Sequence, residues 1–373
     1  MRSFIPIVLI VCIFTLSGGC ISHSDLNSTP GLDDPVNSNL HTNSSSFRNI
    51  TDMSGTVVQI PACPQKVALF SGPIAQIPYI LGVSDRIAAT TPGMKQSLLL
   101  QEIDPSLLNL TDVRGATGEV DYEILTITGV DMVLCPPLDG QLIKKRAKIP
   151  VVVIKNTQGD SFKQIVDQVK FIGLVFNQTD KAEQYETFIH RINDFVSTRV
   201  ASIPDDTRLK VFCGYDTSHM MTYGNDTFLQ ERLNVAGCKN AAILESPNNT
   251  VEKITPSQSE VTMEQILAWN PDVIIIDSGS PDEIYSDKRW APINAVRNHR
   301  VYVQPQGIFK WSRPNAESAV FYSMWLAKTV YPDRFSDVNL SDILREYFKE
   351  FFNYSLNDLQ IEKILRGSYS SNS

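Results

Sequence analysis

The sequence has few of the residues from which catalytic centres and metal sites are usually built. Only five histidines occur among 373 residues, and no two of them lie at the spacing of metal ligands. The six cysteines are widely spaced and form no Cys-x-x-Cys pair. The serine elbow of hydrolases, the phosphate-binding loop, the dinucleotide fingerprint and the His-Glu-x-x-His zinc motif are all absent. These absences remove the simple arguments for an enzyme and for a resident cofactor or metal.

Long apolar runs are scarce as well. One covers residues 4–16, follows Met1-Arg2, and is separated from Cys20 only by small residues. Such charged, apolar and small-residue regions are typical of an export signal, and Cys20 resembles the lipobox cysteine of lipoproteins. We therefore expect a signal peptide over residues 1–20, lipidation at Cys20, and an extracytoplasmic protein anchored to the outer face of the cytoplasmic membrane. A cleaved secretory signal without lipid is the alternative.

No other stretch approaches the roughly 18 to 20 apolar residues that span a bilayer. Residues 21–50 are rich in Ser, Asn, Asp, Thr and Pro and have few large apolar side chains, which predicts a disordered tether. The formal net charge of −8 argues against nucleic acid or anionic lipid surfaces as partners. After the signal and tether, about 320 residues remain, more than one hydrophobic core usually holds, so two lobes are expected.

Two segments of the chain repeat one pattern. Glu123 and Glu264 each follow a valine by three positions and precede an aspartate, Asp131 or Asp272, by eight. This spacing suits a short helix that leads into a buried parallel strand. A single unit of a helix followed by a strand recurs in every α/β protein and is therefore uninformative. The informative feature is that the unit occurs twice with the same spacing. This doubling predicts two lobes of similar plan, each with one carboxylate at an equivalent place for a two-fold partner.

The alternation of short β-branched segments with helical patterns predicts an α/β fold whose sheets are mainly parallel. We expect an N-terminal lobe over 51–158, a long linking helix over 159–200, a C-terminal lobe over 201–373, and a ligand cleft between the lobes. Strands are predicted at 67–70, 86–90, 132–135, 151–154, 209–213, 273–276 and 301–303. Helices are predicted at 74–81, 160–199 with a break at 177–180, 227–236, 318–330 and 340–351.

Aromatic, sulfur and basic side chains gather in loops after predicted strands, where open α/β sheets bind ligands. Trp311 and Arg313 are the main pair, because an indole offers a large rigid contact and a guanidinium can meet an anionic group. The other candidates for ligand contact in these loops are Tyr215, Met220, Tyr223, Phe309 and Lys310. Weaker candidates, all in the first lobe, are Ser71, Pro73, Tyr79, Thr91, Met94 and Arg114. The competing interpretation is that these side chains pack under their loops or are merely solvated.

At this point the sequence resembles a known family: the solute-binding proteins of ABC importers for iron complexes, haem and cobalamin, in the class where one long helix joins two lobes. The resemblance covers roughly residues 50–350. It begins with Ile50–Pro61 and Val67–Phe70, and it includes both glutamate units and the segment Thr222–Phe228. The order and spacing of these motifs agree along the chain.

The resemblance implies a role for the repeated glutamates. In this family the equivalent side chains contact arginines of the membrane permease, so Glu123 and Glu264 would dock this chain on a permease dimer. Such contacts supply charge complementarity and register more than affinity. The implied partners are the permease, its separate ATPase subunits and a small-molecule metal chelate, with the chain itself a monomer that catalyses no reaction.

The resemblance also implies a bulky chelate between the lobes, without naming it. A negatively charged ferric siderophore suits Arg313, Lys310 and Arg114 and is ranked first. Haem would use a histidine or tyrosine ligand such as His219 or Tyr215, and a corrinoid would use the aromatic side chains.

Two other classes of function compete with this one. A surface hydrolase would use Glu123 and Glu264 as a general acid/base pair, which requires the two carboxyl groups within about 10 Å of each other across a pocket. A surface adhesin or scaffold would have no well-formed cleft between lobes.

Overall fold

The computed structural model describes residues 46–115, 118–155, 162–214, 221–223, 228–242 and 259–369. They belong to one compact unit that runs from Ser46 to the C-terminus. The predicted signal peptide, Cys20 and the predicted tether up to residue 45 lie outside the described residues. Within the described part of the chain, no helix is both long and apolar enough to cross a membrane.

The described chain opens with an antiparallel hairpin, β1 (Phe47–Thr51) and β2 (Val57–Pro61). Asp52 organises its turn, because Oδ1 accepts hydrogen bonds from the backbone N–H groups of Ser54 and Thr56 at 2.9 and 3.0 Å. Its Oδ2 accepts from Val153 N–H at 3.2 Å and so ties the hairpin to the first sheet. Burial opposes ionisation of Asp52, but these hydrogen bonds outweigh it and lower its pKa.

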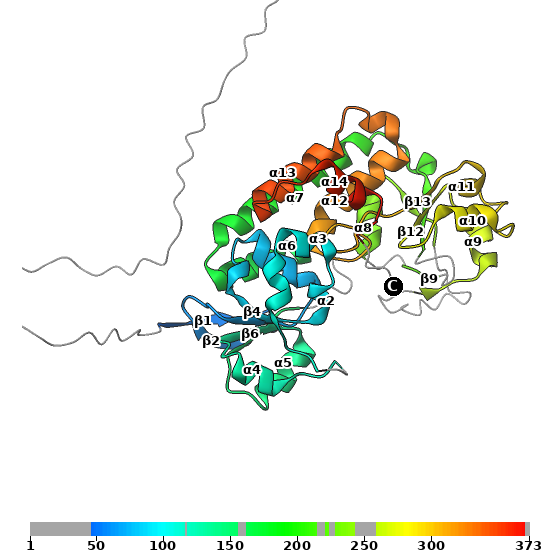
Figure 1. Ribbon diagram of the computed structural model, residues 1–373. Coiled ribbons are helices and arrows are strands. Elements are labelled where there is room, and N and C mark those ends of the chain that lie inside the picture. The colour runs from blue at the N-terminus through cyan, green and yellow to red at the C-terminus, as the bar shows by residue number, and fades with distance from the viewer. Residues whose placement is uncertain are drawn as a thin grey trace, which may run out of the picture. The chain divides into compact units, whose positions relative to one another are not determined.

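The N-terminal lobe, called lobe 1 from here on, has a sheet that is parallel throughout, with the strand order β5-β4-β3-β6-β7. The central strands β3 and β6 are fully buried, as expected when helices cover both faces. One face is covered by α4 (Tyr122–Ile127) and α5 (Pro137–Lys144), as Figure 1 shows. Leu125 and Ile143 of these helices belong to one apolar cluster with Val133 of β6. The strands are β3 (Val67–Leu69), β4 (Ile87–Thr90), β5 (Thr111–Asp112), β6 (Met132–Cys135) and β7 (Val151–Val153).

The C-terminal lobe, called lobe 2 from here on, has a mixed sheet in the order β11-β9-β8-β12-β13, with β10 also paired to β8. Its strands β8, β10, β12 and β13 pair in parallel, and β9 pairs antiparallel with both β8 and β11. The strands are β8 (Lys210–Gly214), β9 (Met221–Thr222), β10 (Lys239–Asn240), β11 (Ser259–Glu260), β12 (Val273–Ile276) and β13 (Val301–Val303). The helices α9 (Met263–Trp269), α10 (Pro281–Ser286) and α11 (Asn294–Arg297) pack on one face through a separate apolar cluster.

Two consecutive helices join the lobes, α6 (Phe162–Phe176) and α7 (Thr179–Val200). The chain turns between them at Asn177, whose φ of 57° is left-handed, so the predicted break at this point is confirmed. The close approach requires Gly173, because a Cβ there would lie 2.9 Å from Cβ of Ala182. The two helices belong to the main core, which also takes in strands of both lobes.

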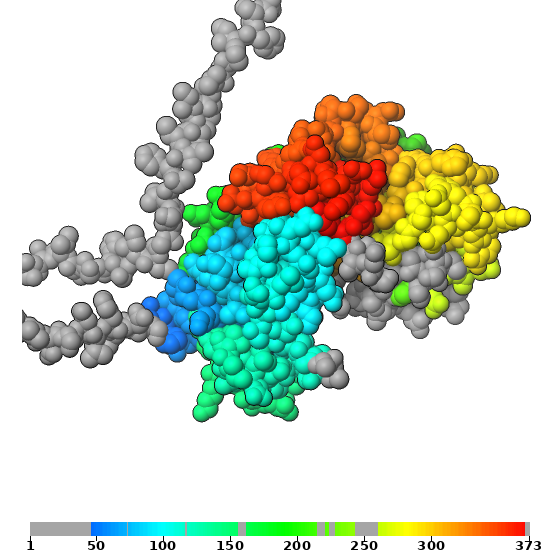
Figure 2. Space-filling view, viewed as in Figure 1, coloured from blue at the N-terminus to red at the C-terminus, as the bar shows by residue number. Residues whose placement is uncertain are grey.

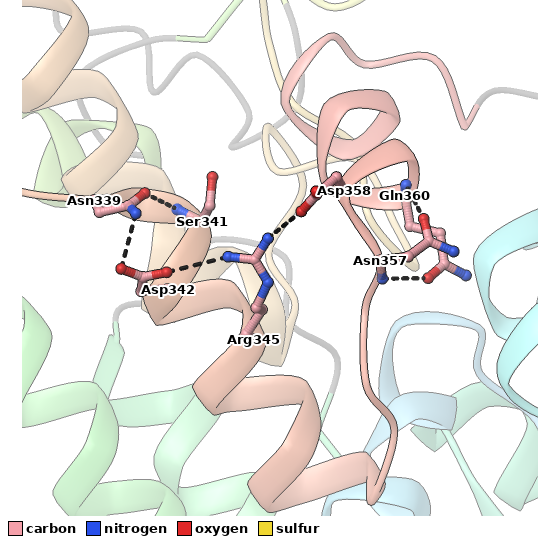
Figure 3. A network of polar contacts seen from close by, with 7 residues as sticks. All are labelled: Asn339, Ser341, Asp342, Arg345, Asn357, Asp358 and Gln360. Atoms are coloured by element: carbon pink, nitrogen blue, oxygen red, sulfur yellow. Dashed lines mark hydrogen bonds and ion pairs between the residues drawn. The ribbon is translucent and has the colours of Figure 1, made fainter.

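Three helices near the C-terminus follow the two sheets in the sequence: α12 (Ala316–Val330), α13 (Leu340–Phe352) and α14 (Asp358–Leu365). Figure 3 shows how α13 and α14 are held, with Arg345 between Asp342 and Asp358 and with Asn357 capping α14. The remaining elements are the helices α1 (Ile77–Ile80), α2 (Pro92–Lys95), α3 (Leu98–Ile103) and α8 (Phe228–Val235) and the short 3₁₀ helices η1 (Pro73–Gln76), η2 (Ser84–Arg86), η3 (Pro105–Asn109), η4 (Asp205–Thr207) and η5 (Pro332–Phe335).

The C-terminal end of the chain reaches back to lobe 1. Glu102 on α3 accepts hydrogen bonds from Gln360 Nε2 at 2.7 Å and from the Tyr369 hydroxyl at 3.1 Å. Figure 2 shows the same neighbourhood, with the C-terminal helices lying against residues of lobe 1. Contacts therefore join the first and last thirds of the sequence.

The predicted fold class, an α/β fold with mainly parallel sheets in two lobes, is confirmed. The first strand begins earlier than the predicted start of the N-terminal lobe at residue 51, because β1 begins at Phe47, within the segment 21–50 predicted as a tether. The predicted boundaries at 158 and 200 fall near the ends of the α6–α7 pair and stay a prediction as domain limits.

Candidate functional site

The repeated glutamates occupy equivalent positions in the two lobes. Glu123 is the second residue of α4 and Glu264 is the second residue of α9, and both are exposed. Each helix begins at a side-chain cap: Asp121 accepts from Ile124 N–H at 2.9 Å, and Thr262 accepts from Gln265 N–H at 3.3 Å. The pKa of Glu264 is lowered, first by a hydrogen bond from its own backbone N–H and then by the Thr262 hydroxyl.

The repeated aspartates have a structural role that explains their spacing. Asp131 Oδ2 accepts from the backbone N–H groups of Gln65 and Lys66, at 2.7 and 3.1 Å, at the start of β3. Asp272 Oδ2 accepts from Lys210 N–H at 2.9 Å, at the start of β8. Each aspartate therefore caps the first strand of the parallel pairing in its own lobe, β3 or β8, while the glutamate eight residues earlier stays exposed on the surface helix.

The two glutamates do not form a catalytic pair. They stand on helices that cover different sheets, as Figure 1 shows, and each helix packs in its own apolar cluster. A hydrolase needs both carboxyl groups at one pocket. The arrangement instead presents two separate exposed acidic side chains.

Arg114 occupies the edge of the lobe 1 sheet just after β5. Its guanidinium donates to both carboxylate oxygens of Asp139, at 3.0 and 2.7 Å, and to the backbone oxygen of Gly118 at 3.0 Å. It also lies 5.2 Å above the ring of Phe70. The Arg114 side chain keeps 23% of its surface exposed.

Arg313 occupies the corresponding edge of lobe 2, in the segment after β13. It donates a hydrogen bond to the Tyr223 hydroxyl, lies 5.6 Å from the Tyr223 ring, and forms an ion pair with Asp277 at 3.5 Å. Tyr223 directly follows β9, and Asp277 directly follows β12. The Arg313 side chain is 29% exposed, whereas the Asp277 side chain is only 3% exposed.

The two lobes thus share one device: a partly exposed arginine held by a largely buried aspartate at the carboxyl edge of a sheet. The aspartate fixes the direction of the guanidinium and offsets much of its charge. An anionic ligand would therefore be held by directed N–H groups more than by net charge. The structure brings together Arg313 and Tyr223, two of the residues predicted to contact a ligand, and it pairs each arginine with an aspartate that was not among the predicted site residues.

The prediction that Trp311 contacts a ligand does not fit the structure. Its side chain is completely buried and stacks on Phe321 with ring centroids 5.3 Å apart. Its indole faces the carboxyl group of Glu317, which is also completely buried. A large aromatic in a loop after a strand predicted a ligand surface, but this loop folds inward and Trp311 becomes part of the core.

Tyr79 is also mainly structural. Its hydroxyl donates to Asp104 Oδ2 at 2.7 Å, and its ring stacks on Phe352 of α13 with centroids 6.1 Å apart. Burial and the nearby Asp104 raise the pKa of Tyr79, so it stays a neutral phenol. It lines a groove of about 390 Å³ with Phe352 and Leu110 rather than joining either arginine.

Among the weaker candidates, Met94 is fully buried and Thr91 is nearly so, whereas Ser71 is half-buried. Lys310 and Phe309 are also half-buried. Pro73 is the first residue of η1, and its side chain lies outside the described part of the structure. Tyr215, Met220, His219 and Cys20 lie outside the described residues.

The cysteines and acidic residues show no sign of a metal centre within the described ranges. Cys135, Cys213 and Cys238 are free, buried thiols, and burial raises the pKa of Cys135 and of Cys213 to about 12, whereas Cys63 is half-buried. In the part of the chain that the structure describes, no three His, Cys, Asp or Glu side chains group closely enough to hold a metal ion.

With this geometry in place, comparisons with known proteins can be stated. A family model described as "Periplasmic binding protein" matches residues 67–307, more than half of the chain. The molybdate-binding protein MolA of Haemophilus influenzae is 25% identical over 333 residues, covering 83% of this chain and 92% of MolA. YvrC of Bacillus subtilis, named an uncharacterized ABC transporter substrate-binding lipoprotein, is 25% identical over 296 residues, covering 77% and 87%.

A crystal structure of a periplasmic solute binding protein from Veillonella parvula has the same fold. It superposes with a TM-score of 0.75 at 25% sequence identity, over 88% of this chain and 99% of the other. The likeness therefore extends over nearly all of the described residues, including both sheets and the linking helices.

Proposed function

The chain belongs to the periplasmic binding protein family, in the helical-backbone class that serves ABC importers, and on this basis we propose that it captures an anionic metal chelate and delivers it to a permease. A ferric siderophore is the solute ranked first. The observation that carries this proposal is the pair of arginine–aspartate devices, one in each lobe.

The chemistry of these devices favours a solute that carries several anionic oxygens. The side chains of Arg114 and Arg313 are partly exposed, at 23% and 29%, and a guanidinium fork matches carboxylate and related oxygens in two-point contact. Tyr223 adds an aromatic face beside Arg313. Haem or a corrinoid is the alternative within the same importer class and would depend more on aromatic and histidine side chains.

A second candidate solute is a small metal oxyanion. The reason is that MolA, which is named a molybdate-binding protein, is similar to this chain over most of the length of both proteins. An oxyanion would use the same guanidinium N–H groups but would leave the aromatic side chains without a role.

For the delivery step, we propose that Glu123 and Glu264 contact the permease. Both are exposed, both stand at the start of a short helix, and one belongs to each lobe. A two-fold permease with one basic site in each half would be matched by this arrangement. The proposal includes a lipid anchor at Cys20, which would keep the chain at the outer face of the cytoplasmic membrane.

Thermal unfolding of the purified mature chain tests the solute class. The panel is a catecholate and a hydroxamate ferric siderophore, haem, cobalamin and molybdate. A ligand at 100 times its dissociation constant adds about 2.7 kcal/mol of stability, which raises the midpoint by a few degrees. A shift with a siderophore alone supports the proposal, whereas a shift with molybdate alone replaces it by the oxyanion. No shift with any of the five would count against a receptor for metal complexes.

A further inference from the structure

The backbone of Ile308 is gripped from both lobes. Its N–H donates to Oε2 of Glu317 at 2.9 Å, and its carbonyl oxygen accepts from the Ser97 hydroxyl at 2.8 Å. Glu317 is the second residue of α12, and Ser97 caps the start of α3 in lobe 1. All three residues are buried. Ile308 is therefore a point where the segment after β13 is fastened to lobe 1.

Glu317 makes a second link to lobe 1 through its own backbone. Its N–H donates to Oε1 of Gln76 at 3.2 Å, and Gln76 is fully buried. The carboxyl group fits against Gly307, because a Cβ at that glycine would lie 1.7 Å from Glu317 Oε1. The buried carboxyl group of Glu317 therefore lies where the 304–313 segment, α12 and lobe 1 meet.

The environment of this carboxyl group disfavours its ionised form. Burial raises the pKa of Glu317 to about 7, against the smaller opposing effects of Trp311 and of the Ile308 and Phe309 backbone N–H groups. The indole of Trp311 opposes this rise, but neither its Nε1 nor Glu317 Oε1 has a hydrogen-bond partner among the described residues.

Among the described residues near Glu317, we find none whose own titration would compensate a charge on its carboxyl group. Tyr347 of α13 and Tyr185 of α7 face the same region, and burial raises the pKa of both phenols above the ordinary value, so they stay neutral. The cation Arg313 of the same segment is engaged with Asp277 and Tyr223. Lys310 of this segment is half-buried, and Arg232 of α8 donates to the Ser318 hydroxyl and the Phe228 carbonyl.

Hydrogen bonds within the 304–313 segment connect the part of the chain that contains Ile308 with Arg313. The segment is closed on itself by hydrogen bonds from Trp311 N–H to the Pro305 carbonyl at 3.2 Å and from Arg313 N–H to the Lys310 carbonyl at 3.1 Å. Asn315 Nδ2 then donates to the carbonyl of Arg313 at 2.9 Å. A segment tied together in this way moves as a unit.

We propose that Glu317 is a proton-sensitive latch that positions the 304–313 segment, and with it Arg313, against lobe 1. With its proton, the carboxyl group is stable in its buried place and the segment stays closed. Without it, release of the segment is favoured, because release lets water reach the carboxylate. Protonation therefore stabilises the closed position and ionisation favours opening.

Hydrogen exchange of the full mature protein between pH 5 and pH 8.5, without any solute, tests this latch. After correction for intrinsic exchange rates, protection of the 304–313 amides should fall as the pH rises toward 7, by up to about a hundredfold if the open form fully hydrates Glu317. Glu317→Gln should remove this pH dependence and keep the segment protected at pH 8. Glu362→Gln, on the exposed surface of α14, is the matched control and should behave as wild type.

Ser97→Ala provides an independent arm. It frees the Ile308 carbonyl but leaves Glu317 in place, so it should lower protection of the segment at every pH and keep the pH dependence. A pH-independent protection in the wild type, or a pH dependence that persists in Glu317→Gln, would overturn the latch. If Glu317→Gln fails to fold, the wild-type and Ser97→Ala profiles still decide. The experiment contains no solute and no permease, so its outcome is separate from that of the solute-binding and uptake experiments.

Discussion

Arg114 and Arg313 illustrate how a single side chain can be prepared for a ligand before the ligand arrives. Each guanidinium is held by an aspartate that is more buried than itself, so little side-chain entropy remains to be lost on binding. Each aspartate also competes with an incoming anion for the same N–H groups. Affinity at such a site depends on orientation, and it should be sensitive to the loss of either arginine.

Replacing Arg114 or Arg313 by alanine should weaken solute binding without unfolding the protein. A hydrogen bond to a charged group contributes about 1.5 to 3 kcal/mol, so we expect the dissociation constant to rise roughly 10- to 100-fold for each change. Calorimetric titration with whichever solute of the panel stabilises the protein would measure it. Arg289→Ala is the control, since Arg289 also pairs with an aspartate, Asp287, but on the outer surface of lobe 2. An unchanged dissociation constant in both site variants would remove the arginines from the solute site.

Glu317 has a consequence for stability as well as for local opening. Its pKa is raised from 4.5 to about 7 in the folded state, so the folded protein binds the proton more tightly than the unfolded chain does. Stability from this group is therefore fully present below about pH 4.5 and is lost as the pH rises to about 7, by on the order of 3 kcal/mol. Asp52, whose pKa is lowered, acts in the opposite direction and in a lower pH range.

The difference between wild type and Glu317→Gln isolates this effect. We expect the variant to gain stability relative to wild type as the pH rises from 5 to 8, measured as the difference in unfolding free energy at each pH. The direction follows because the amide remains neutral at both values. A difference that stays constant between pH 5 and pH 8 would show that Glu317 does not titrate in this range.

At the scale of elements, the repeated unit of helix, strand and capping aspartate organises both lobes. The glutamate-to-aspartate spacing that the sequence displays serves two purposes at once, since the glutamate starts the helix and the aspartate caps the first strand of the lobe. The doubling is thus partly a folding requirement. It does not by itself prove a shared function for the glutamates.

Replacing Asp272 by alanine should destabilise lobe 2 by about 1 kcal/mol, because the Lys210 N–H at the start of β8 loses its acceptor. Asp272→Asn should cost less, since an amide oxygen can still accept this bond. Urea unfolding of both variants measures the two losses. Asp205→Ala, at an exposed ion pair with Lys239, is the control and should change stability little. Equal losses for the alanine and asparagine variants would contradict the capping role.

Local pattern was enough to predict the central strands and the long helices, since a buried β-branched run such as Val273–Ile276 and a helical period such as that of Thr179–Val200 are properties of neighbouring residues. It could not predict the two-residue strands β9 to β11, which depend on their partners. Nor could it reveal that Gln360 meets Glu102, or that the loop after β13 turns Trp311 inward, because both result from contacts between distant segments. Asp277 was within reach, as an acid directly after a fully apolar strand.

At the scale of the molecule, one core runs through the linking helices and into strands of both lobes. Opening the lobes widely would expose part of this core, at about 25 cal/mol for each square ångström of apolar surface. The contacts of Gln360 and Tyr369 with Glu102 oppose the same movement. We therefore expect small adjustments at the junction, such as that at Ile308, rather than a large hinge motion when solute binds.

The same rigidity bears on how the permease would recognise the chain. Two exposed carboxylates on a rigid frame keep a fixed separation, so Glu123 and Glu264 can set the register of docking without contributing to the solute site. Replacing both by alanine should leave the solute dissociation constant unchanged and abolish uptake in cells or in vesicles that contain the importer. Each single change should reduce uptake less than the double change does. Glu186→Ala with Glu362→Ala removes the same number of charges from α7 and α14 and should leave uptake intact, which separates docking from a general effect of net charge. Undiminished uptake in the Glu123 and Glu264 double variant would refute docking through these residues, and lost solute affinity would show instead that they belong to the binding site.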